Sequence, residues 1–533
     1  MSLVGKVGRK RPRARFAMAM VYLALAVGAV TTLYPFALML STGLKGPTDQ
    51  NDNKLVPAYL REDPALEDKY LDDKYAGDKT MIASTRVGGD ASPEVVERYE
   101  RFLMSLPLDM WTAGFRTAPG QVTGRLQIRY QSWLRAKFHN DIDTLNRAYT
   151  EEAVAFQTVV PPPELLDRKT WSQPKTPKYR DWLKFKEGLP VEFRVPIRDT
   201  RLWQEWIRGK FQNQFGNVPK EYAGKATSFE TLELPFKGLP LFREFLARAV
   251  PERYMNGVAE TQWRSSEYDL IDHTGALDSW LPPSENPQHQ TLPVSSYENR
   301  FVAQHTTEIR SEFAKRNFGY VLDYILLNGR AVFNTFAFCA LAVITQLIVN
   351  PLAAYALSRY PVRQSGQILI FLLATMAFPA EVAMIPSFLL LRDLGLLNTF
   401  AALVLPAAAS GYMIFLLKGF FDSLPQELFE AGSLDGAPET TMMTRIALPL
   451  SRPVLGYLAL VAFMGAYGSF LYAFLVVQDQ RMWTLMVWVY QLQNSAPRAV
   501  MMAALTLAAL PTLIVFLLSQ RAILTGIVLP GER

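Results

Sequence analysis

The stretch Glu430-Ala431-Gly432-Ser433-Leu434-Asp435-Gly436 is followed, after nine residues, by Ile446-Ala447-Leu448-Pro449. This short charged segment lies between long apolar runs, so we expect a loop between two membrane-spanning helices. The residues from Pro425 onwards favour a helix with early acidic side chains, which the helix dipole stabilises. Asp435-Gly436 should end that helix, because glycine readily adopts left-handed backbone conformations. A second short helix is predicted from Pro438 to Arg445, within a loop of residues 421–452.

Six stretches are apolar and long enough to cross a bilayer, which takes about 20 residues of helix. Between the first and the second lies a long polar region without an apolar run of that length. The 533 residues therefore divide into a basic tail (1–15), a first span (16–42), a polar insert (43–325) and a membrane core (326–533). The predicted spans are Phe16–Leu40, Val332–Ser358, Ile368–Leu391, Thr399–Leu417, Pro453–Val477 and Val500–Leu518.

The positive charge of the chain belongs to its membrane part. Residues 46–325 hold 40 acidic and 37 basic side chains, which leaves 9 acidic and 18 basic side chains elsewhere. Basic residues that flank spans stay in the cytoplasm, and the tail before the first span carries six of them without an acidic residue. We therefore expect both termini in the cytoplasm and residues 43–325 outside it. The positive charge of the membrane part indicates membrane lipid as a partner and not nucleic acid. A cleaved signal peptide is the alternative for the first span. However, the apolar run of this span is longer than the usual apolar core of a signal peptide.

The charged loop resembles the coupling loop of ABC-transporter permeases, whose form is E-A-A, three residues, G, nine residues and I-x-L-P. The one departure is Gly432, where the second alanine is usual. Residues 332–530 are also similar to the maltose-type, carbohydrate-uptake branch of binding-protein-dependent importer permeases. That similarity rests on Leu352–Arg359, Leu394–Thr399 and Pro449–Pro453, and on Tyr34-Pro35-Phe36 and Ser41–Lys45 near the first span.

The resemblance implies a six-helix α-helical permease that forms half of a heterodimeric channel in the inner (cytoplasmic) membrane. The implied partners are a second permease subunit, a dimer of cytoplasmic ATPases and an extracytoplasmic solute-binding protein. No Walker-type glycine loop occurs in the chain, so ATP and Mg would be used by the partner ATPase and this chain would bind no cofactor. The implied ATPase-docking set is Glu430, Ala431, Gly432, Asp435, Gly436, Ile446, Leu448 and Pro449.

The fifth predicted span carries candidates for a translocation path. The family often shows Trp-Asn-x-Phe here, whereas this chain has Tyr467-Gly468-Ser469-Phe470. Tyr467 and Ser469 could hydrogen-bond a polar solute, and simple packing of small residues between helices is the open alternative. Asn334 in the second span and Phe470 complete the candidate set. Glu381, between two prolines in the third span, is expected to face water at a helix break near the outer surface.

The insert contains a sequence repeat. Tyr130 to Asn140 (YQSWLRAKFHN) recurs as Trp203 to Asn213 (WQEWIRGKFQN), and the offset of 73 residues continues through Phe156/Phe229. Aromatic and aliphatic residues at helical spacing predict amphipathic helices in both copies. We therefore expect a mainly helical domain built from a duplicated unit, about 99–164 and 179–237, unless two aromatic-rich helices are alike by chance.

A membrane-anchored enzyme or sensor, with the insert as its active part, is the alternative to a permease. Part of the insert, 133–149, resembles a helical stretch of some β-galactosidase-like glycoside hydrolases, but that stretch brings no catalytic carboxylate. We assign no catalytic residue and no metal ligand, since none of the four histidines has a second ligand at metal-binding spacing. The coupling loop favours the importer, because a scaffold does not need an ATPase-docking surface. A carbohydrate or glycoside is the solute that the resemblance implies.

Overall fold

The computed structural model describes residues 12–47, 49, 53–86, 91–115, 124–153, 155–235, 239–254, 257–267, 292–327, 330–360, 363–376, 379–493 and 496–526. Most of the predicted basic tail, residues 1–11, lies outside the described residues. The chain divides into two compact units, residues 1–320 with 495–500 and residues 321–494 with 501–533. Each unit is described by itself.

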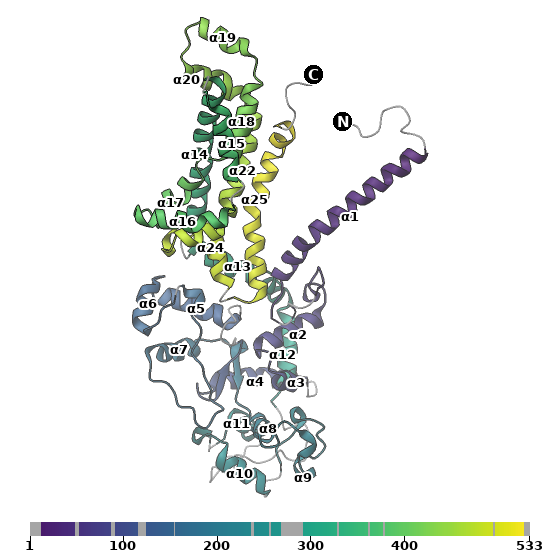
Figure 1. Ribbon diagram of the computed structural model, residues 1–533. Helices are drawn as coiled ribbons and strands as arrows, with labels where there is room; N and C mark the ends of the chain where they lie inside the picture. Colours follow the sequence, from purple (N-terminus) through teal and green to yellow (C-terminus); the bar gives the residue numbers. More distant parts are fainter. Residues whose placement is uncertain are drawn as a thin grey trace. The chain divides into compact units, whose positions relative to one another are not determined.

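The first unit begins with the long helix α1 (Pro12–Gly43), shown in purple in Figure 1. Its side chains are exposed through most of its length, and it is long and apolar enough to cross a membrane. The end of α1 is fastened to the insert by Asn317, whose amide donates to Gly43 O (2.9 Å) and Lys45 O (2.6 Å). Tyr59 also donates its hydroxyl proton to Leu44 O at 2.7 Å. The last carbonyls of a helix lack partners within it, and these side chains supply hydrogen bonds to the chain as it leaves α1.

The insert is mainly helical, as predicted. Its only described sheet pairs β1 (Trp111–Ala113) with β2 (Arg194–Pro196), antiparallel. The helices and short 3-10 turns (η) are η1 (Ala58–Leu60), α2 (Asp63–Lys74), α3 (Lys79–Ser84), α4 (Pro93–Ser105), α5 (Arg125–Lys137), α6 (Ile142–Tyr149), η2 (Phe156–Thr158), α7 (Pro177–Glu187), η3 (Val191–Phe193), α8 (Asp199–Lys210), η4 (Phe215–Asn217), α9 (Lys220–Ala223), η5 (Phe229–Thr231), α10 (Pro240–Arg248), η6 (Glu252–Tyr254), α11 (Ala259–Glu267), α12 (Val294–Gln304) and α13 (Thr306–Leu327).

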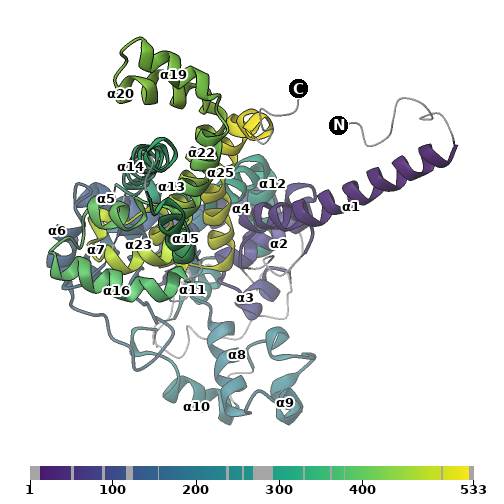
Figure 2. The same cartoon turned by 45° about the horizontal axis from the view of Figure 1, so that its top comes forward.

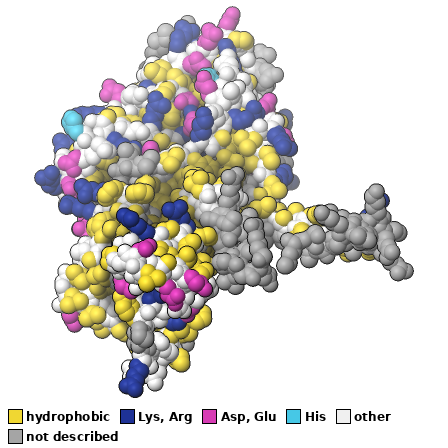
Figure 3. Space-filling view, turned by 90° about the horizontal axis from the view of Figure 1, so that it is seen from above, with side chains coloured by type: hydrophobic (Ala, Val, Ile, Leu, Met, Phe, Trp, Pro, Cys, Tyr) yellow, Lys and Arg dark blue, Asp and Glu magenta, His cyan; other side chains and the backbone are white. Residues whose placement is uncertain are grey.

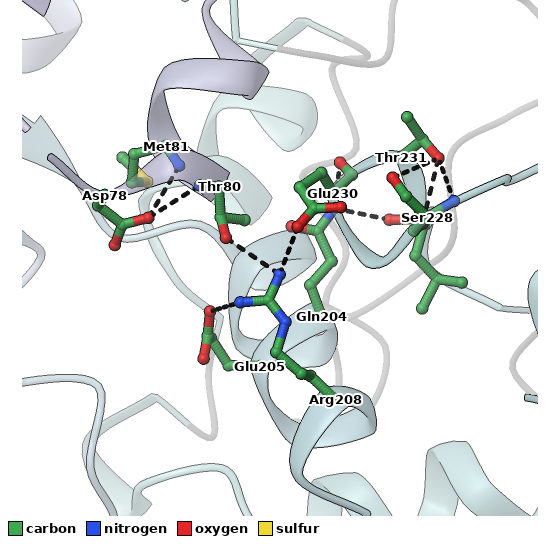
Figure 4. A network of polar contacts seen from close by, with 10 residues as sticks. Asp78, Thr80, Met81, Gln204, Glu205, Arg208, Ser228, Glu230 and Thr231 are labelled. Carbon is green, nitrogen blue, oxygen red and sulfur yellow. Dashed lines mark hydrogen bonds and ion pairs between the residues drawn. The ribbon is translucent and has the colours of Figure 1, made fainter. Parts of the chain in front are cut away.

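Two buried glutamines make the same hydrogen bonds at the repeat offset of 73 residues. Gln131 Nε2 in α5 donates to Gln157 O (2.8 Å) and Val159 O (3.0 Å) around η2. Gln204 Nε2 in α8 donates to Glu230 O (3.1 Å) and Leu232 O (2.8 Å) around η5. Figure 4 shows the second of these turns, where Arg208 also pairs with Glu230. In both halves a helix therefore holds the following turn through an amide.

The helix ends and the strands are also matched between the two halves. The pair His139-Asn140 after α5 and the pair Gln212-Asn213 after α8 all have positive φ, between 51° and 60°. In the β1–β2 ladder Thr112 lies opposite Val195, and each of these residues is five positions after a Leu-Pro pair. A local twofold axis through that pair would therefore exchange equivalent positions. Equivalent positions of the two predicted copies therefore share these backbone features.

The equivalent helices α5 and α8 each lie in an aromatic core. In the first, Tyr130 of α5 packs against Trp182 (5.4 Å between ring centroids) and Phe185 (5.1 Å) of α7. In the second, Trp203 of α8 packs in the same way against Phe242 (5.7 Å) and Phe245 (5.3 Å) of α10. Aromatic pairs at such distances and edge-on angles are favourable beyond the area that they bury. The cores form two distinct hydrophobic clusters.

The second unit contains the described membrane core. In Figure 1, α14, α15, α18 and α22 run side by side. The helices of this part are α14 (Ala331–Arg359), α15 (Ser365–Met376), α16 (Ala380–Asp393), α17 (Phe400–Val404), η9 (Leu405–Ala407), α18 (Gly411–Asp422), α19 (Gln426–Leu434), α20 (Glu439–Met442), the π-helix η10 (Met443–Ala447), α21 (Leu448–Leu450), α22 (Arg452–Gly468), α23 (Phe470–Val476), η11 (Gln480–Met482), α24 (Leu485–Gln493) and α25 (Arg498–Gly526).

Some of the six predicted spans are broken helices. Among the described residues, α1, α14 and α25 are each long and apolar enough to cross a membrane alone. The segment Phe400–Ala407, which contains α17 and η9, forms a bent pair with α18, with 51° between the two helix axes. The predicted third span is divided into α15 and α16, with Glu381 exposed in the first turn of α16. The predicted fifth span is interrupted between α22 and α23 at Ser469.

A buried asparagine and a glycine make the bend before α18 feasible. Asn350 in α14 is fully buried; its Oδ1 accepts from Ser410 N (2.7 Å) and its Nδ2 donates to Ala408 O (3.3 Å). A Cβ atom at Gly411 would lie 2.3 Å from Leu372 O, so only glycine allows α15 to approach α18 this closely. The bend is thus hydrogen-bonded inside the protein, as an apolar surrounding requires.

We expect Gln131→Leu and Gln204→Leu each to lower the free energy of unfolding of the insert by about 1–3 kcal/mol, because each leaves buried carbonyls without a donor. Thermal unfolding of the purified chain, followed by tryptophan fluorescence, measures the effect. Ser132→Ala is the control, since that exposed hydroxyl bonds only to its own helix, at Ile128 O. If either glutamine variant unfolded at the same temperature as the control, the prediction that the two amides have equivalent roles would be wrong.

Candidate functional site

Helix α19 and the turn after it form the first part of the charged loop. Glu427 lies in the first turn of α19, near the positive end of the helix dipole. The helix ends where Gly436 adopts φ +73°. Gly436 N donates to Ser433 O (3.1 Å) and Ala437 N to Gly432 O (3.0 Å), which together form a Schellman motif. The predicted helix and its glycine stop are therefore both present.

The buried side of α19 rests on the end of α14. Phe429 is only 8% exposed, and the Arg359 guanidinium lies 3.5 Å from the centre of its ring. Arg359 also donates to Phe421 O at 2.8 Å, at the end of α18. Tyr355, one turn earlier in α14, donates its hydroxyl proton to Glu439 Oε2 at 2.8 Å. Cation–π and charged hydrogen bonds of this kind fix the loop against the helix that carries them.

Gly432 faces the second half of the loop. A Cβ atom there would lie 3.6 Å from Ile446 Cδ1 and from Met442, which is ordinary van der Waals distance. The alanine that is usual at this position would therefore fit without displacing a neighbour. The departure at Gly432 leaves the loop geometry intact.

The outer side of α19 is exposed and mixed in character. Glu427, Glu430 and Asp435 are exposed carboxylates, and Leu434 is 89% exposed among them. The Glu430 carboxylate accepts a hydrogen bond from Gln426 Nε2 at 2.9 Å, within the same helix. Figure 2 shows α19 and α20 at one end of the membrane core, and Figure 3, viewed from that end, shows hydrophobic and charged side chains interspersed. This side combines an apolar tip with negative charge.

The Ile-x-Leu-Pro end of the loop turns the chain into the next span. Ile446 lies in the π-helix and Pro449 near the start of α21, where its missing N–H costs nothing. The axis then bends by 82° between Glu439–Leu450 and α22. Ser451, fully buried, donates its hydroxyl proton to Ala447 O at 2.7 Å inside this bend. The predicted second helix is thus part α-helix and part π-helix, and it leads directly into α22.

The candidate path residues are engaged to different degrees. Asn334 is buried in α14 and donates to Arg481 O (2.9 Å) and Trp483 O (3.1 Å). Tyr467 donates to Ala508 O of α25 at 2.6 Å. Phe470 packs on Tyr490 of α24, with 4.8 Å between ring centroids. Ser469 Oγ, at the break between α22 and α23, is buried and has no hydrogen-bond partner among the described residues.

An apolar cavity of 690 Å³ lies among α14, α22 and α25. Tyr467 is one of its lining residues, and Phe336, Cys339, Phe463 and Pro511 are others. Asn334, Ser469 and Phe470 are not among them. The candidates of the path therefore do not gather in one cavity of the described core.

The sequence did not reveal the residues that hold the loop in place. Arg359 and Tyr355 both lie in Leu352–Arg359, a stretch that carries the family resemblance but gives no sign of these contacts. Both precede Phe429 by about seventy positions, so no local pattern links them. Among the residues that the structure describes, no group of three or more His, Cys, Asp or Glu side chains is placed to hold a metal ion.

Comparison of the sequence with known proteins identifies its family. Residues 349–527 match the family described as "Binding-protein-dependent transport system inner membrane component". The sn-glycerol-3-phosphate transport system permease protein UgpE of Rhizobium meliloti (strain 1021) is 31% identical over 233 residues, which cover 43% of this chain and 80% of UgpE. This chain belongs to that family. Protein LplC of Bacillus subtilis (strain 168) is 32% identical over 200 residues, 34% of this permease and 67% of LplC.

A solved structure of a bacterial ABC transporter involved in the import of the acidic polysaccharide alginate also matches this permease. It is 25% identical, covers 39% of the permease and 79% of its own chain, and gives a TM-score of 0.35. None of these matches extends over the whole chain.

The chain is therefore a transmembrane permease subunit of an ABC importer and a multi-pass protein of the inner membrane. It is a transport subunit and not an enzyme, which decides against the enzyme-or-sensor alternative. Membership in the family implies, in general terms, an ATP-driven partner, a partner permease and a binding protein.

We expect Gly432→Ala and Gly436→Ala to act on α19 in opposite directions. Alanine at 432 should stabilise the helix by up to about 1 kcal/mol through its helix propensity. Alanine at 436 should cost about 1–2 kcal/mol, because φ there is left-handed. Hydrogen–deuterium exchange of the peptide that spans α19 measures both effects, as slower exchange for the first variant and faster exchange for the second. Equal exchange in the two variants would contradict the assigned helix stop.

Proposed function

We propose that this permease subunit imports a carbohydrate or glycoside. The observation that carries the proposal is the match over 80% of a permease named for sn-glycerol-3-phosphate, which is a polyol ester. The similarity to the maltose-type branch at Leu352–Arg359 and Leu394–Thr399 supports the same class of hydroxyl-rich solute.

We further propose that the exposed side of α19 docks on a cytoplasmic ATPase dimer. The docking set is the one given by the sequence, with Glu430, Leu434 and Asp435 on the outside of the loop. An exposed leucine among carboxylates suits a binding cleft that is apolar at its base and basic at its rim. Phe429 and Arg359 would transmit movement of the ATPase to α14, since they join α19 to its end.

The proposed orientation places the loop, both termini and the ATPase in the cytoplasm, and residues 43–325 outside. The basic residues before α1 support this arrangement. The insert would then face the solute-binding protein, and a second permease subunit would complete the channel as a heterodimer. ATP and Mg would be bound by the ATPase and not by this chain.

For the translocation path we propose the break at Ser469. Its buried Oγ has no partner among the described residues, so it could bond a passing solute hydroxyl. Tyr467 and Phe470 flank it in sequence and shape the break through α25 and α24. Asn334, whose amide holds two loop carbonyls, would support the path and not contact the solute directly.

We expect Glu430→Lys to abolish ATP-driven uptake while leaving membrane insertion intact. The substitution reverses a charge in the docking set, whereas its intramolecular contact is a single exposed hydrogen bond to Gln426. Uptake of a labelled solute by cells that depend on this transporter, together with quantification of the protein in membranes, measures both properties.

Asp393→Lys is the matched control for that experiment. It makes the same type of charge reversal at an exposed aspartate, the last residue of α16, outside the coupling loop. Its uptake should stay near that of the unsubstituted protein. Normal uptake by Glu430→Lys would refute the docking assignment.

A further inference from the structure

The insert contains a polar cavity of 440 Å³ that none of the candidate site residues lines. Its walls come from three segments that are far apart in sequence. Asp109 follows α4, residues 169–173 precede α7, and Glu252 and Arg253 belong to η6. The second of these segments contributes Lys169, Trp171, Ser172 and Gln173.

Hydrogen bonds fix the three segments to one another. Tyr254, next to Arg253, donates its hydroxyl proton to Asp109 O at 2.8 Å. Arg253 donates to Trp171 O at 2.5 Å. Lys186, fully buried, donates to Leu108 O and Trp111 O at 2.5 and 2.6 Å, on both sides of Asp109 in sequence. The cavity is therefore preformed by buried contacts.

Trp171 lies where the two halves of the insert meet. It is half-buried and packs against both hydrophobic clusters, the one around Tyr130 and the one around Trp203. The Arg253 guanidinium lies 5.2 Å from the indole centre and holds the orientation of the ring. Ligand sites favour such junctions, and they combine an aromatic surface with a few polar groups.

The charged groups of the cavity differ in what they already bind. Lys169 donates to Ala247 O at 2.7 Å, and Arg253 is bonded to Trp171 O. In the part of the chain that is described, no hydrogen bond or ion pair engages the carboxylate of Asp109 or Glu252. Carboxylates only accept hydrogen bonds, so the cavity offers acceptors to a ligand that donates. Two cations balance the two anions, which disfavours both an anionic and a cationic ligand.

We propose that this cavity binds a neutral saccharide. Its hydroxyl groups would donate to Asp109 and Glu252, and the apolar C–H surface of its ring would lie against Trp171. Ser172 and Gln173 add a hydroxyl and an amide that can bond further hydroxyl groups. The inference rests on the proposed carbohydrate import for its biological sense, and it places a sugar site in the insert, on residues other than the candidate path residues.

The test is isothermal titration of the full-length chain in lipid nanodiscs, without its partners. The probes are glucose, maltose, cellobiose and trehalose, and separately sn-glycerol 3-phosphate and spermidine. We expect at least one neutral sugar to bind. Trp171→Ala and Glu252→Gln should each weaken that binding by about tenfold or more, which corresponds to the loss of one good contact.

Two further variants serve as controls. Trp171→Phe retains an aromatic ring and should keep most of the affinity, even if Trp171→Ala disturbs folding. Glu233→Gln changes an exposed carboxylate outside the cavity and should leave binding unchanged. Absence of binding by every neutral sugar, binding by the phosphate or spermidine alone, or sugar binding that survives Glu252→Gln would each overturn the proposal.

Uptake by the complete reconstituted transporter separates this inference from the proposed function. Sugar uptake without sugar binding to the isolated chain would refute the cavity and leave carbohydrate import standing. Sugar binding to the isolated chain, lost in Glu252→Gln, without sugar uptake would refute carbohydrate import and support the cavity.

Discussion

A backbone polar group surrounded by lipid or an apolar core must find its hydrogen bond inside the protein. In the membrane core, side-chain amides meet this requirement where the helices break. Asn350 bonds the backbone before α18, Asn334 bonds the turn at η11, and Asn398 accepts from Gln478 N (2.6 Å) and Asp479 N (2.8 Å). Asn350 thus lets the chain bend before α18 without leaving buried backbone groups unsatisfied, and Asn334 and Asn398 hold the turn between α23 and α24. The permease can therefore combine a continuous helix such as α14 with a bent pair such as α17 and α18.

The same device organises the insert. Gln131 and Gln204 hold equivalent turns, and Asn317 fastens the end of α1. An amide can donate to two carbonyls at once, so a single side chain fixes both ends of a short turn. Because α5 and α8 share this device and each packs on the aromatic side chains of the second helix that follows, each lies in its own core. The proposed cavity lies beside the junction between the cores, where Trp171 packs against both of them.

The sequence predicted those features that depend on residues close together in the chain. Apolar length gave the spans, helical spacing gave the amphipathic helices of the insert, and Asp435-Gly436 gave the stop of α19. The sequence could not give contacts between distant positions, such as Arg359 on Phe429 or Tyr355 with Glu439, because nothing near either residue specifies its partner. Asn334 illustrates the limit, since a polar residue in a span indicates a special role but not whether it bonds a solute or the backbone. The division of the third span into α15 and α16 followed from the prolines near Glu381, which are local signals.

The charged loop of residues 421–452, for which we propose the ATPase-docking role, depends on both local and distant contacts. Its motif is local, yet its mechanical use depends on attachments at both ends. At one end Phe429 lies under Arg359 of α14, and at the other the π-helix leads through Ser451 into α22. A force applied at the exposed Leu434 would therefore reach two spans through packed and hydrogen-bonded contacts, without a flexible segment between them. Gly432 sits where the two halves of the loop meet, with room for the usual methyl group. The rigidity of the loop thus depends on its attachments to α14 and α22 more than on the strict motif, which explains how the family pattern tolerates this glycine.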